Sequence, residues 1–297
     1  MTTHVRGTGT GAVLLYYKLG AQVRETIRHL LAQEQSITCL VLVDNCSNDG
    51  VLSTVSQDLS DDPSVDVDIK LLTMENNLGY SSGMNAGFAA LRKWHPDLLF
   101  TLFITHEVVL ETDCLRQLLT CITSEQVGAV GPVLTRLNDG SVWSAGGTID
   151  GRGNVRHRTN ASDGELLWLD GACILADNNS MAAIGGFDDA YFLYWEDVDF
   201  ADRMRKHAGI RCVQSAHAAQ ETGTAPIYYK VRGQIRFWLD RKRPVLVLLT
   251  VLKSIALIAA RDLPRRDSAR ARNRFDGIAD GLKRSTGGGQ SMLRELS

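Results

Sequence analysis

The sequence predicts an α/β fold built on a doubly wound, mostly parallel sheet. Continuous apolar runs such as AVLLYY and TCLVLVD are typical of strands that are buried on both faces of a sheet. They alternate with segments such as AQVRETIRHLLAQ, whose apolar residues recur at helical spacing. This alternation indicates parallel strands joined by helices, and such sheets bind ligands at the carboxyl ends of their strands.

The expected elements follow one another in order. The strand AVLLYY, the helix AQVRETIRHLLAQ and the strand TCLVLVD come first, and DIKLLTM repeats the strand pattern. SSGMNAGFAALRKW is expected to be a helix, and DLLFTLFIT a further strand. In the second half, SVWSAGGTIDGRGNVRHR resembles a hairpin with glycine-rich turns, and LLWLDGACILADNN contains a strand.

Composition limits the size of the fold and the class of partner. The chain has 297 residues, 44% of them hydrophobic and 22% charged, which suits one large α/β domain or two small ones. Its 34 acidic and 32 basic residues give a formal charge of −2, so we expect no nucleic-acid partner. The six cysteines are scattered without a C-x-x-C pair, and there is no signal peptide pattern. We therefore expect a reducing, cytoplasmic location without structural disulfides.

The longest apolar run extends from Val245 to Ala260. It is shorter than the roughly 20 residues needed to cross a bilayer, and it contains Lys253, so we expect that it does not span a membrane. Arginine-rich stretches flank it, which leaves a peripheral helix on the anionic inner face of a membrane as an alternative. A helix docked in the core or in a homodimer interface is slightly favoured.

Three short motifs do not have the context that their usual function requires. GTGTGA precedes the first strand, whereas a dinucleotide-binding loop would follow it. DNCSNDG lacks the closing glutamate of a calcium loop, because Val55 occupies that position. HEVVL has Leu110 where a zinc protease has its second histidine. We therefore exclude these three kinds of site.

Four motifs at strand ends occur in a specific order. LVDNCSNDG ends the second strand, ENNLGYSSGMNAG follows the third, FITHEVVL ends the next, and IGGFDDAYFLYWEDVDFADRMRKHAGI comes about 80 residues later. In this order and spacing they resemble the family 2 glycosyltransferases of the GT-A fold, especially the bacterial rhamnosyltransferase-like branch. The resemblance covers about Ala12 to Trp238. It implies an inverting glycosyltransferase that uses a nucleoside-diphosphate sugar of the UDP or dTDP type.

The resemblance also implies a division of the chain. Residues 1–11 would form a flexible tail and residues 12–225 the GT-A catalytic domain, followed by a helical segment, 226–297. Within the catalytic domain, the nucleotide-sugar half would cover about 12–140, and the acceptor half about 141–225.

The expected donor-binding residues lie at the ends of the first strands. The resemblance places Asp44 against the uracil or thymine ring, and Asn77 and Gly79 along the ribose and diphosphate, and it assigns Tyr16 to the same site. A carboxylate at a strand end can accept hydrogen bonds from a base edge, and glycine permits close backbone approach. The alternative for Asp44 is an Asx turn or a helix cap. The other glycines of this segment are expected to let a helix pack tightly on the sheet.

The strand that ends in Thr105, His106 and Glu107 departs from the family pattern. Resembling proteins have an Asp-x-Asp or Asn-x-Asp element here, whose carboxylate binds a divalent metal on the diphosphate. Glu107 is the carboxylate that remains, and Glu221 is the second candidate ligand, near the position where the family commonly has a histidine. Mn²⁺ or Mg²⁺ would suit these oxygen ligands. We expect His106 to be a structural or donor-contacting residue.

The acidic cluster in YFLYWEDVDFADRM is the strongest single signal. Carboxylates at the start of a helix are favoured by its dipole, and this structural explanation suffices for Glu196 or Asp199. It does not explain why a glycine turn and an aromatic run precede Glu196 and Asp197. The resemblance makes Asp197 the catalytic base, with Glu196 beside it.

The acceptor side is expected to involve Asp170 and Gly171, which would border the acceptor cavity. Trp168 and Trp195 would stack on sugar faces, although partly buried packing is the commoner role of tryptophan. The resemblance lets Arg232 reach the diphosphate, with a surface ion pair as the alternative. The acceptor would be a glycan, a lipid-linked saccharide or a small molecule.

A competing hypothesis is a non-catalytic relative that binds a sugar nucleotide or a partner protein, as the altered metal element suggests. A sugar-1-phosphate nucleotidyltransferase is disfavoured, because no glycine-rich, arginine-containing triphosphate loop follows the first strand.

Overall fold

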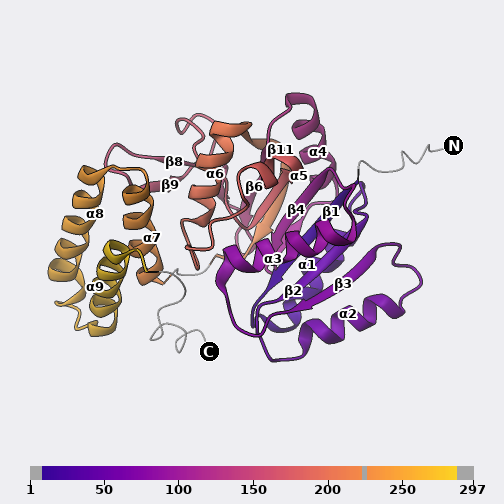
Figure 1. Cartoon of the computed structure of the whole chain (residues 1–297), viewed down its shortest axis with the longest axis horizontal. Coiled ribbons are helices and arrows are strands. Elements are labelled where there is room, and N and C mark those ends of the chain that lie inside the picture. Colours follow the sequence, from indigo (N-terminus) through magenta and orange to yellow (C-terminus); the bar gives the residue numbers. More distant parts are fainter. Residues whose placement is uncertain (1–8, 223–225, 286–297) are drawn as a thin grey trace.

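The computed structural model describes residues 9–222 and 226–285, and it has a mixed sheet at its centre with helices on both faces (Figure 1). In these residues the sheet has nine strands, in the order β3-β2-β1-β4-β10-β6-β11-β5, and β7 pairs with β6. The strands are β1 (Thr10–Tyr16), β2 (Cys39–Asp44), β3 (Asp68–Thr73), β4 (Phe100–Thr105), β5 (Val108–Leu110), β6 (Ala129–Arg136), β7 (Val142–Ser144), β10 (Cys173–Asp177) and β11 (Ile210–Gln220).

The first four strands are parallel, as the alternation of strands and helices predicts. β1 pairs in parallel with β2 and β4, and β2 with β3. β1 and β2 are buried along their whole length, whereas β3 is half exposed because it forms the edge of the sheet. The similar apolar runs in the sequence did not distinguish the edge strand from the central ones.

The second half of the chain adds antiparallel strands. β10 runs antiparallel to β4 and β6, and β5 runs antiparallel to β11, while β6 and β11 are parallel. The predicted hairpin is confirmed as β8 (Gly147–Ile149) paired with β9 (Val155–His157) in a separate small sheet.

The helices cover both faces of the central sheet. Alternate residues of a strand point to opposite faces. Thus Val13 and Leu15 of β1 belong to the same apolar cluster as Met84, whereas Leu14 belongs to the cluster that contains Ile27. The helical elements are η1 (Gly20–Gln22), α1 (Val23–Leu31), α2 (Val51–Asp61), α3 (Gly79–Trp94), α4 (Cys114–Glu125), α5 (Asn178–Ala183), α6 (Glu196–His207), α7 (Ile227–Asp240), α8 (Pro244–Leu257), η2 (Ile258–Asp262) and α9 (Ser268–Lys283).

Two glycines let α3 lie directly on β1, which is the packing role that the sequence predicts for them. A Cβ atom on Gly83 would lie 2.5 Å from Cδ1 of Leu15, and one on Gly87 would lie 2.3 Å from Cγ1 of Val13. Both distances are shorter than van der Waals contact, so a larger residue at either position would force Leu15 or Val13 to move. The loop that begins α3 is thereby held close to the carboxyl end of β1.

The expected domain boundaries fall near residues that the structure does not describe. Residues 1–8 of the predicted tail lie outside the described residues, and β1 begins at Thr10, inside the range assigned to the tail. Residues 223–225 are also outside, and α7 begins at Ile227. The division into domains stays a prediction.

α7, α8 and α9 form a helical lobe at one end of the molecule (Figure 1). α8 continues through η2 to give a helix from Pro244 to Asp262, whose 19 residues and mean hydropathy of 1.9 are sufficient, by length and composition, to cross a membrane. Length and composition alone therefore do not exclude a membrane span, contrary to the argument from the shorter apolar run. A helix buried in the core is contradicted, because only 17% of the apolar stretch is buried. The homodimer interface, which we favoured together with the core, stays a prediction.

Candidate active site

The carboxyl ends of β1, β2 and β4 lie side by side and carry polar residues. The strand register pairs Tyr16 with Asp44, and Leu15 with Thr105, so the three strands end at the same level. Ligands of parallel sheets bind at such an edge. The structure therefore brings together the predicted donor residues Tyr16 and Asp44 and the strand end that precedes His106.

Tyr16 and Asp44 are oriented by hydrogen bonds within the protein. The Tyr16 hydroxyl donates to Oδ2 of Asp49 (2.5 Å) and accepts from the backbone N–H of Gly20 (3.0 Å). Burial, followed by the bond to Asp49, raises the pKa of Tyr16. Oδ1 of Asp44 accepts from the N–H of Ser47 (2.8 Å), three residues on, so Asp44 caps the local loop as the structural alternative suggests, although this bond is not an Asx turn. A carboxylate has about four lone-pair sites, so this bond does not exclude a bond to a base.

Asn45, which was not predicted as a site residue, joins the two donor loops. Its Nδ2 donates to Oδ1 of Asn77 (2.9 Å) and to the carbonyl of Gly79 (3.1 Å). Its Oδ1 accepts from the N–H of Leu78 (3.0 Å). Asn77 in turn accepts from the N–H of Gly79 (2.9 Å), so its side chain holds the loop as expected.

Gly79 and Tyr80 connect the donor loop to the segment that carries the acids. Gly79 has a φ of +82°, and a Cβ atom there would lie 2.2 Å from the carbonyl oxygen of Phe192. The N–H of Tyr80 donates to that same carbonyl (2.7 Å), and its hydroxyl donates to the carbonyl of Gly171 (2.6 Å). The close approach that the sequence predicts for Gly79 is thus made to the protein's own backbone. Tyr80 carried no signal in the sequence beyond its place after Gly79.

His106 and Glu107 form a two-residue turn between β4 and β5. Nδ1 of His106 donates to the carbonyl of Leu15 (3.0 Å), and its ring meets the edge of Tyr16 with 5.6 Å between centroids. Nε2 of His106 lies 3.6 Å from Oε2 of Glu107. The turn explains how these polar residues follow a buried strand: the chain leaves the sheet at Thr105, and Glu107 is 26% exposed at the site.

Glu107 and Glu221 each lie one residue beyond the last paired residues of β5 and β11, which are Val108 and Gln220. Glu221 is exposed, and its Oε1 accepts from Nε2 of Gln22 (3.5 Å). In the described part of the chain, no three His, Cys, Asp or Glu side chains are grouped so as to hold a metal ion. Mg²⁺ bound to a nucleotide commonly takes one or two carboxylates and completes its coordination with water and phosphate oxygens. The two glutamates fit a site of that open kind.

Glu196 and Asp197 are held by a strained turn at the start of α6. Tyr194 and Trp195, which precede them, both have left-handed backbone conformations, with φ of +63° and +74°. Such conformations are costly for residues with bulky side chains, and they cluster at functional sites. Gly233 of α7 makes room for Trp195, because a Cβ atom there would lie 2.9 Å from Cβ of Trp195. The helical lobe therefore supports the turn that presents the acids.

The two acids have unusual protonation behaviour. Burial, and next the charge of Asp197, raises the pKa of Glu196 well above its ordinary value. Oε2 of Glu196 is buried and has no hydrogen-bond partner among the described residues. Burial and the charge of Asp170 raise the pKa of Asp197 to about 7, against the opposing effect of the N–H groups of Val198 and Gly171. Burial therefore favours the protonated form of both acids, and the two carboxyl groups titrate as a pair with raised pKa values.

The next two acids of the same helix differ from this pair. Asp199 accepts from Arg203 (2.7 Å) and Arg241 (3.0 Å). Asp202 is paired with Arg241 (2.7 Å) and Lys206 (2.8 Å), and these cations lower its pKa. Ion pairing therefore explains Asp199 and Asp202, whereas it does not explain the acids before them.

Asp170 and Gly171, which were expected to border the acceptor cavity, lie beside Asp197. A Cβ atom on Gly171 would lie 3.3 Å from Cβ of Asp197. Oδ2 of Asp170 accepts from Nε1 of Trp143 (3.1 Å) and lies 3.8 Å from Nδ1 of His157. A cluster of carboxylates, formed by Asp170, Glu196 and Asp197, is thus brought together from two distant segments.

Three predicted site residues are deeply buried: Trp168, Trp195 and Arg232 are 3%, 4% and 2% exposed. Nε1 of Trp168 donates to the carbonyl of Thr148 (3.3 Å). Arg232 donates to the carbonyl of Ala190 (3.4 Å) and lies in the interior rather than at the surface. Packing therefore accounts for both tryptophans as they stand, and ligand contacts by these three residues stay predictions.

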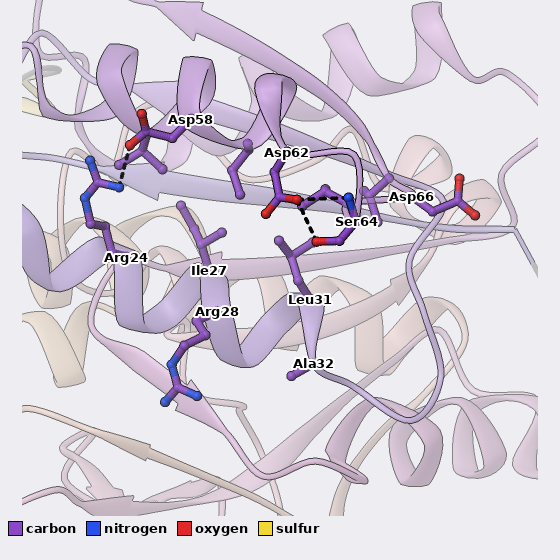
Figure 2. Close-up of a pocket in the computed structure, with 13 residues that line it drawn as sticks. Arg24, Ile27, Arg28, Leu31, Ala32, Asp58, Asp62, Ser64 and Asp66 are labelled. Atoms are coloured by element: carbon purple, nitrogen blue, oxygen red, sulfur yellow. Dashed lines mark hydrogen bonds and ion pairs between the residues drawn. The ribbon is translucent and has the colours of Figure 1, made fainter.

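A cavity of about 420 Å³ lies elsewhere, between α1 and α2 (Figure 2). Its floor is apolar, with Ile27 and Leu31, and the exposed ion pair of Arg24 with Asp58 (2.8 Å) lies at its edge. None of the predicted site residues lines this cavity. We therefore assign the candidate active site to the strand ends and the acidic turn.

Comparison with protein families gives one extended match. A family model described as glycosyltransferase like family 2 matches residues 10–238. A similar relative is N-acetylglucosaminyl-diphospho-decaprenol L-rhamnosyltransferase of Mycobacterium tuberculosis, which is 28% identical over 72% of this chain and 78% of its own length.

Solved structures give a likeness of fold. The mannosyltransferase PcManGT of Pyrobaculum calidifontis, in complex with GDP-Man and Mn²⁺, has a TM-score of 0.59 and 13% identity, covering 92% of this chain and 86% of that one. S. aureus TarS 1-349, in complex with UDP-GlcNAc, has a TM-score of 0.60 and 12% identity, covering 92% of this chain and 81% of that one. At this identity the likeness shows the fold alone, and it confirms the predicted GT-A fold.

Proposed function

Because this chain belongs to glycosyltransferase family 2, is similar to its rhamnosyltransferases and is a glycosyltransferase of the GT-A fold, we propose that it transfers a hexosyl group from a UDP- or dTDP-sugar to an acceptor hydroxyl, with inversion. The observation that carries this proposal is the pair Glu196 and Asp197 at the strained start of α6. A carboxyl group with a pKa of about 7 suits a general base at neutral pH.

Asp197 acts as the base in a single displacement. The proton of the acceptor hydroxyl moves to the carboxylate of Asp197 while the acceptor oxygen bonds to the anomeric carbon. The bond from that carbon to the diphosphate breaks, and its electron pair leaves with the nucleoside diphosphate. Glu196 stays protonated, since burial and the charge of Asp197 raise its pKa, and it adds no negative charge beside the leaving group. One displacement inverts the anomeric configuration and needs no covalent intermediate.

The nucleotide sugar binds at the ends of β1, β2 and β4. Asp44 binds the uracil or thymine ring, and Asn77 and Gly79 bind the ribose and diphosphate. Tyr16 and His106 form the adjoining wall of the site. The hydrogen bonds of Asn45 to the Asn77 loop support this assignment, because they organise the loop before a ligand arrives.

Glu107 and Glu221 would hold Mn²⁺ or Mg²⁺ together with the diphosphate oxygens. The ion would supply positive charge that stabilises the leaving nucleoside diphosphate. The open carboxylate pair supports this part of the proposal, as does the Mn²⁺ in the complex of the mannosyltransferase.

The acceptor approaches from the side of Asp170 and Gly171, with Trp168 and Trp195 behind them. A lipid-linked saccharide is the acceptor class that we favour, since the name of the M. tuberculosis relative specifies a diphospho-decaprenol substrate. Glycans and small molecules remain the alternatives. All six cysteines are free, which agrees with a reducing, cytoplasmic location.

Ligand-dependent thermal stability tests the donor assignment. UDP- and dTDP-hexoses, with and without Mn²⁺, would be compared on the native chain, on Asp44→Ala and on the control Asp61→Ala at an exposed position of α2. A donor at 100 times its Kd stabilises by about 2.7 kcal/mol, which corresponds to roughly 5 °C or more in Tm. We expect this shift in the native chain and the control, and a smaller one in Asp44→Ala. No shift with any nucleotide sugar would contradict the proposal.

A further inference from the structure

On α8 the polar side chains face the protein and the apolar ones face solvent, which is the reverse of what is expected for a helix in water. Thr250 and Ser254 are each 3% exposed and face the protein, whereas Leu248 and Leu252 are 57% and 53% exposed. A helix at the surface of a soluble protein normally turns its apolar stripe to the core and its polar residues to solvent. The inversion shows that α8 packs within the lobe without burying its leucines, so these leucines need another apolar environment.

The exposed side chains form one extended surface, which we call the α8 face. Its members share one side of the helix and its continuation: Val245, Leu248, Leu249, Leu252, Ile255 and Leu263. On the opposite side, Val247, Thr250 and Ser254 are buried at helical spacing, where α8 lies against α7 and α9. Contiguous exposed apolar surfaces of this kind mark interaction sites in folded proteins.

Basic residues stand at both ends of the α8 face. Lys242 and Arg243 are exposed before it, and Arg261, Arg265 and Arg266 are exposed after it. The acids near these ends are already engaged. Asp262 is fully buried and bonded to Arg274 (2.9 Å), Asp240 is paired with Arg284 (3.1 Å), and Asp267 accepts from the N–H of Arg270 (2.9 Å) to cap α9. The net charge around the α8 face is therefore positive at each end.

We propose that the α8 face lies in the plane of an anionic lipid membrane, with its leucines among the acyl chains and its terminal arginines and lysine at the phosphate groups. An apolar strip flanked by cations matches the surface of such a membrane. A second copy of this chain fits less well, because either antiparallel or parallel pairing of two α8 faces would bring basic ends against basic ends. A helix across the membrane would have to leave α7 and α9, against which Thr250 and Ser254 are buried.

This docking would orient the acceptor half of the site. Lys253, on α8, donates to Oδ1 of Asn154 (2.6 Å), and Trp238, on α7, donates to the carbonyl of Gly153 (3.1 Å). Both partners lie in the turn of the β8–β9 hairpin, so the hairpin is tied to the helix that meets the membrane. The proposal does not depend on the identity of the donor or on the reaction.

Vesicle flotation of the full chain tests the docking. Vesicles of phosphatidylcholine alone would be compared with vesicles that contain phosphatidylglycerol, at low and high salt. The variants are Leu248→Glu with Leu252→Glu, and Arg265→Glu with Arg266→Glu. The matched controls are Leu99→Glu with Leu137→Glu, which are 50% and 47% exposed, and Lys70→Glu with Lys93→Glu; none of these residues belongs to α7, α8 or α9.

We expect binding to the anionic vesicles only, weakened by salt, and at least about tenfold weaker partitioning in both α8 variants, because each basic residue near the surface contributes about fivefold. The controls should bind as the native chain does. Equal binding to neutral vesicles would overturn the proposal, as would resistance to extraction at alkaline pH, which indicates a spanning helix. Absence of vesicle binding, together with a dimer in light scattering that Leu248→Glu with Leu252→Glu dissociates, would assign the α8 face to a second copy.

Discussion

The pH dependence of transfer follows directly from the environment of Asp197. Burial and the nearby charge of Asp170 raise its pKa to about 7. Only the ionised form accepts a proton, so about one molecule in eleven is competent at pH 6 and about ten in eleven at pH 8. The transfer rate should therefore rise about tenfold between these values. An aspartate with an ordinary pKa would give a flat profile over the same range.

A substitution at Asp170 should move this profile. Asp170→Asn removes one negative charge while keeping an oxygen that accepts from Trp143, so the pKa of Asp197 should fall. A fall of one unit would reduce the tenfold rise between pH 6 and pH 8 to about twofold. Because Asp170 is also an expected acceptor residue, the shape of the profile is the relevant quantity, rather than its height.

The assay is single-turnover transfer from a saturating donor between pH 5 and pH 9, with Asp61→Asn on α2 as the charge-matched control. Asp61 is exposed and accepts from Gln57 (2.9 Å), so its removal should leave the profile unchanged. A native profile that is flat from pH 5.5 upward would refute the reasoning. If the transfer rate rises over the same pH range in the native enzyme and in Asp170→Asn, the charge of Asp170 does not affect the pKa of Asp197.

Three further substitutions test other parts of the account. Glu107→Gln should weaken donor binding in calorimetry at least about tenfold when Mn²⁺ is present and little in EDTA, because the lost charge acts through the ion. His106→Ala should weaken donor binding less. Equal weakening by Glu107→Gln in both buffers would contradict the metal role. Gly79→Ala should lower the free energy of unfolding by more than about 2 kcal/mol, since its Cβ would meet Phe192, whereas Gly20→Ala, with a φ of +71° and no atom within 4 Å, should cost only about 1 kcal/mol. Asp197→Asn should be more stable than the native chain at pH 8. Between pH 4 and pH 7 the folded native chain retains a proton that the unfolded chain releases, so the native free energy of unfolding falls by about 4 kcal/mol as pH rises, whereas the amide does not titrate. Equal Tm differences at pH 5 and pH 8 would argue against the raised pKa.

The sequence predicts the fold well where physical patterns are local. The buried parallel strands are visible as apolar runs, and Gly83 and Gly87 mark the close packing of α3 on β1. The edge position of β3 and the antiparallel entry of β5 and β10 are not visible, because strand order is set by contacts between distant segments.

The candidate site was predicted in part for the same reason. Asp44, Glu107 and Asp197 stand at ends of elements, where polar residues are conspicuous. Asn45 and Tyr80 were not assigned a role, because their function lies in hydrogen bonds to partners far along the chain, such as Gly171. The inverted face of α8 was also missed, since an apolar run gives no indication of which side is turned inward.

The measurement that tests the central claim most directly is single-turnover transfer by Asp197→Asn, combined with calorimetric donor binding on the same preparation. The amide keeps the shape of the side chain and cannot accept the proton. We predict a rate at least about 100-fold below that of the native enzyme, with donor affinity within about twofold of the native value. A variant that binds donor normally and transfers at a near-native rate would contradict the assignment of Asp197 as the base.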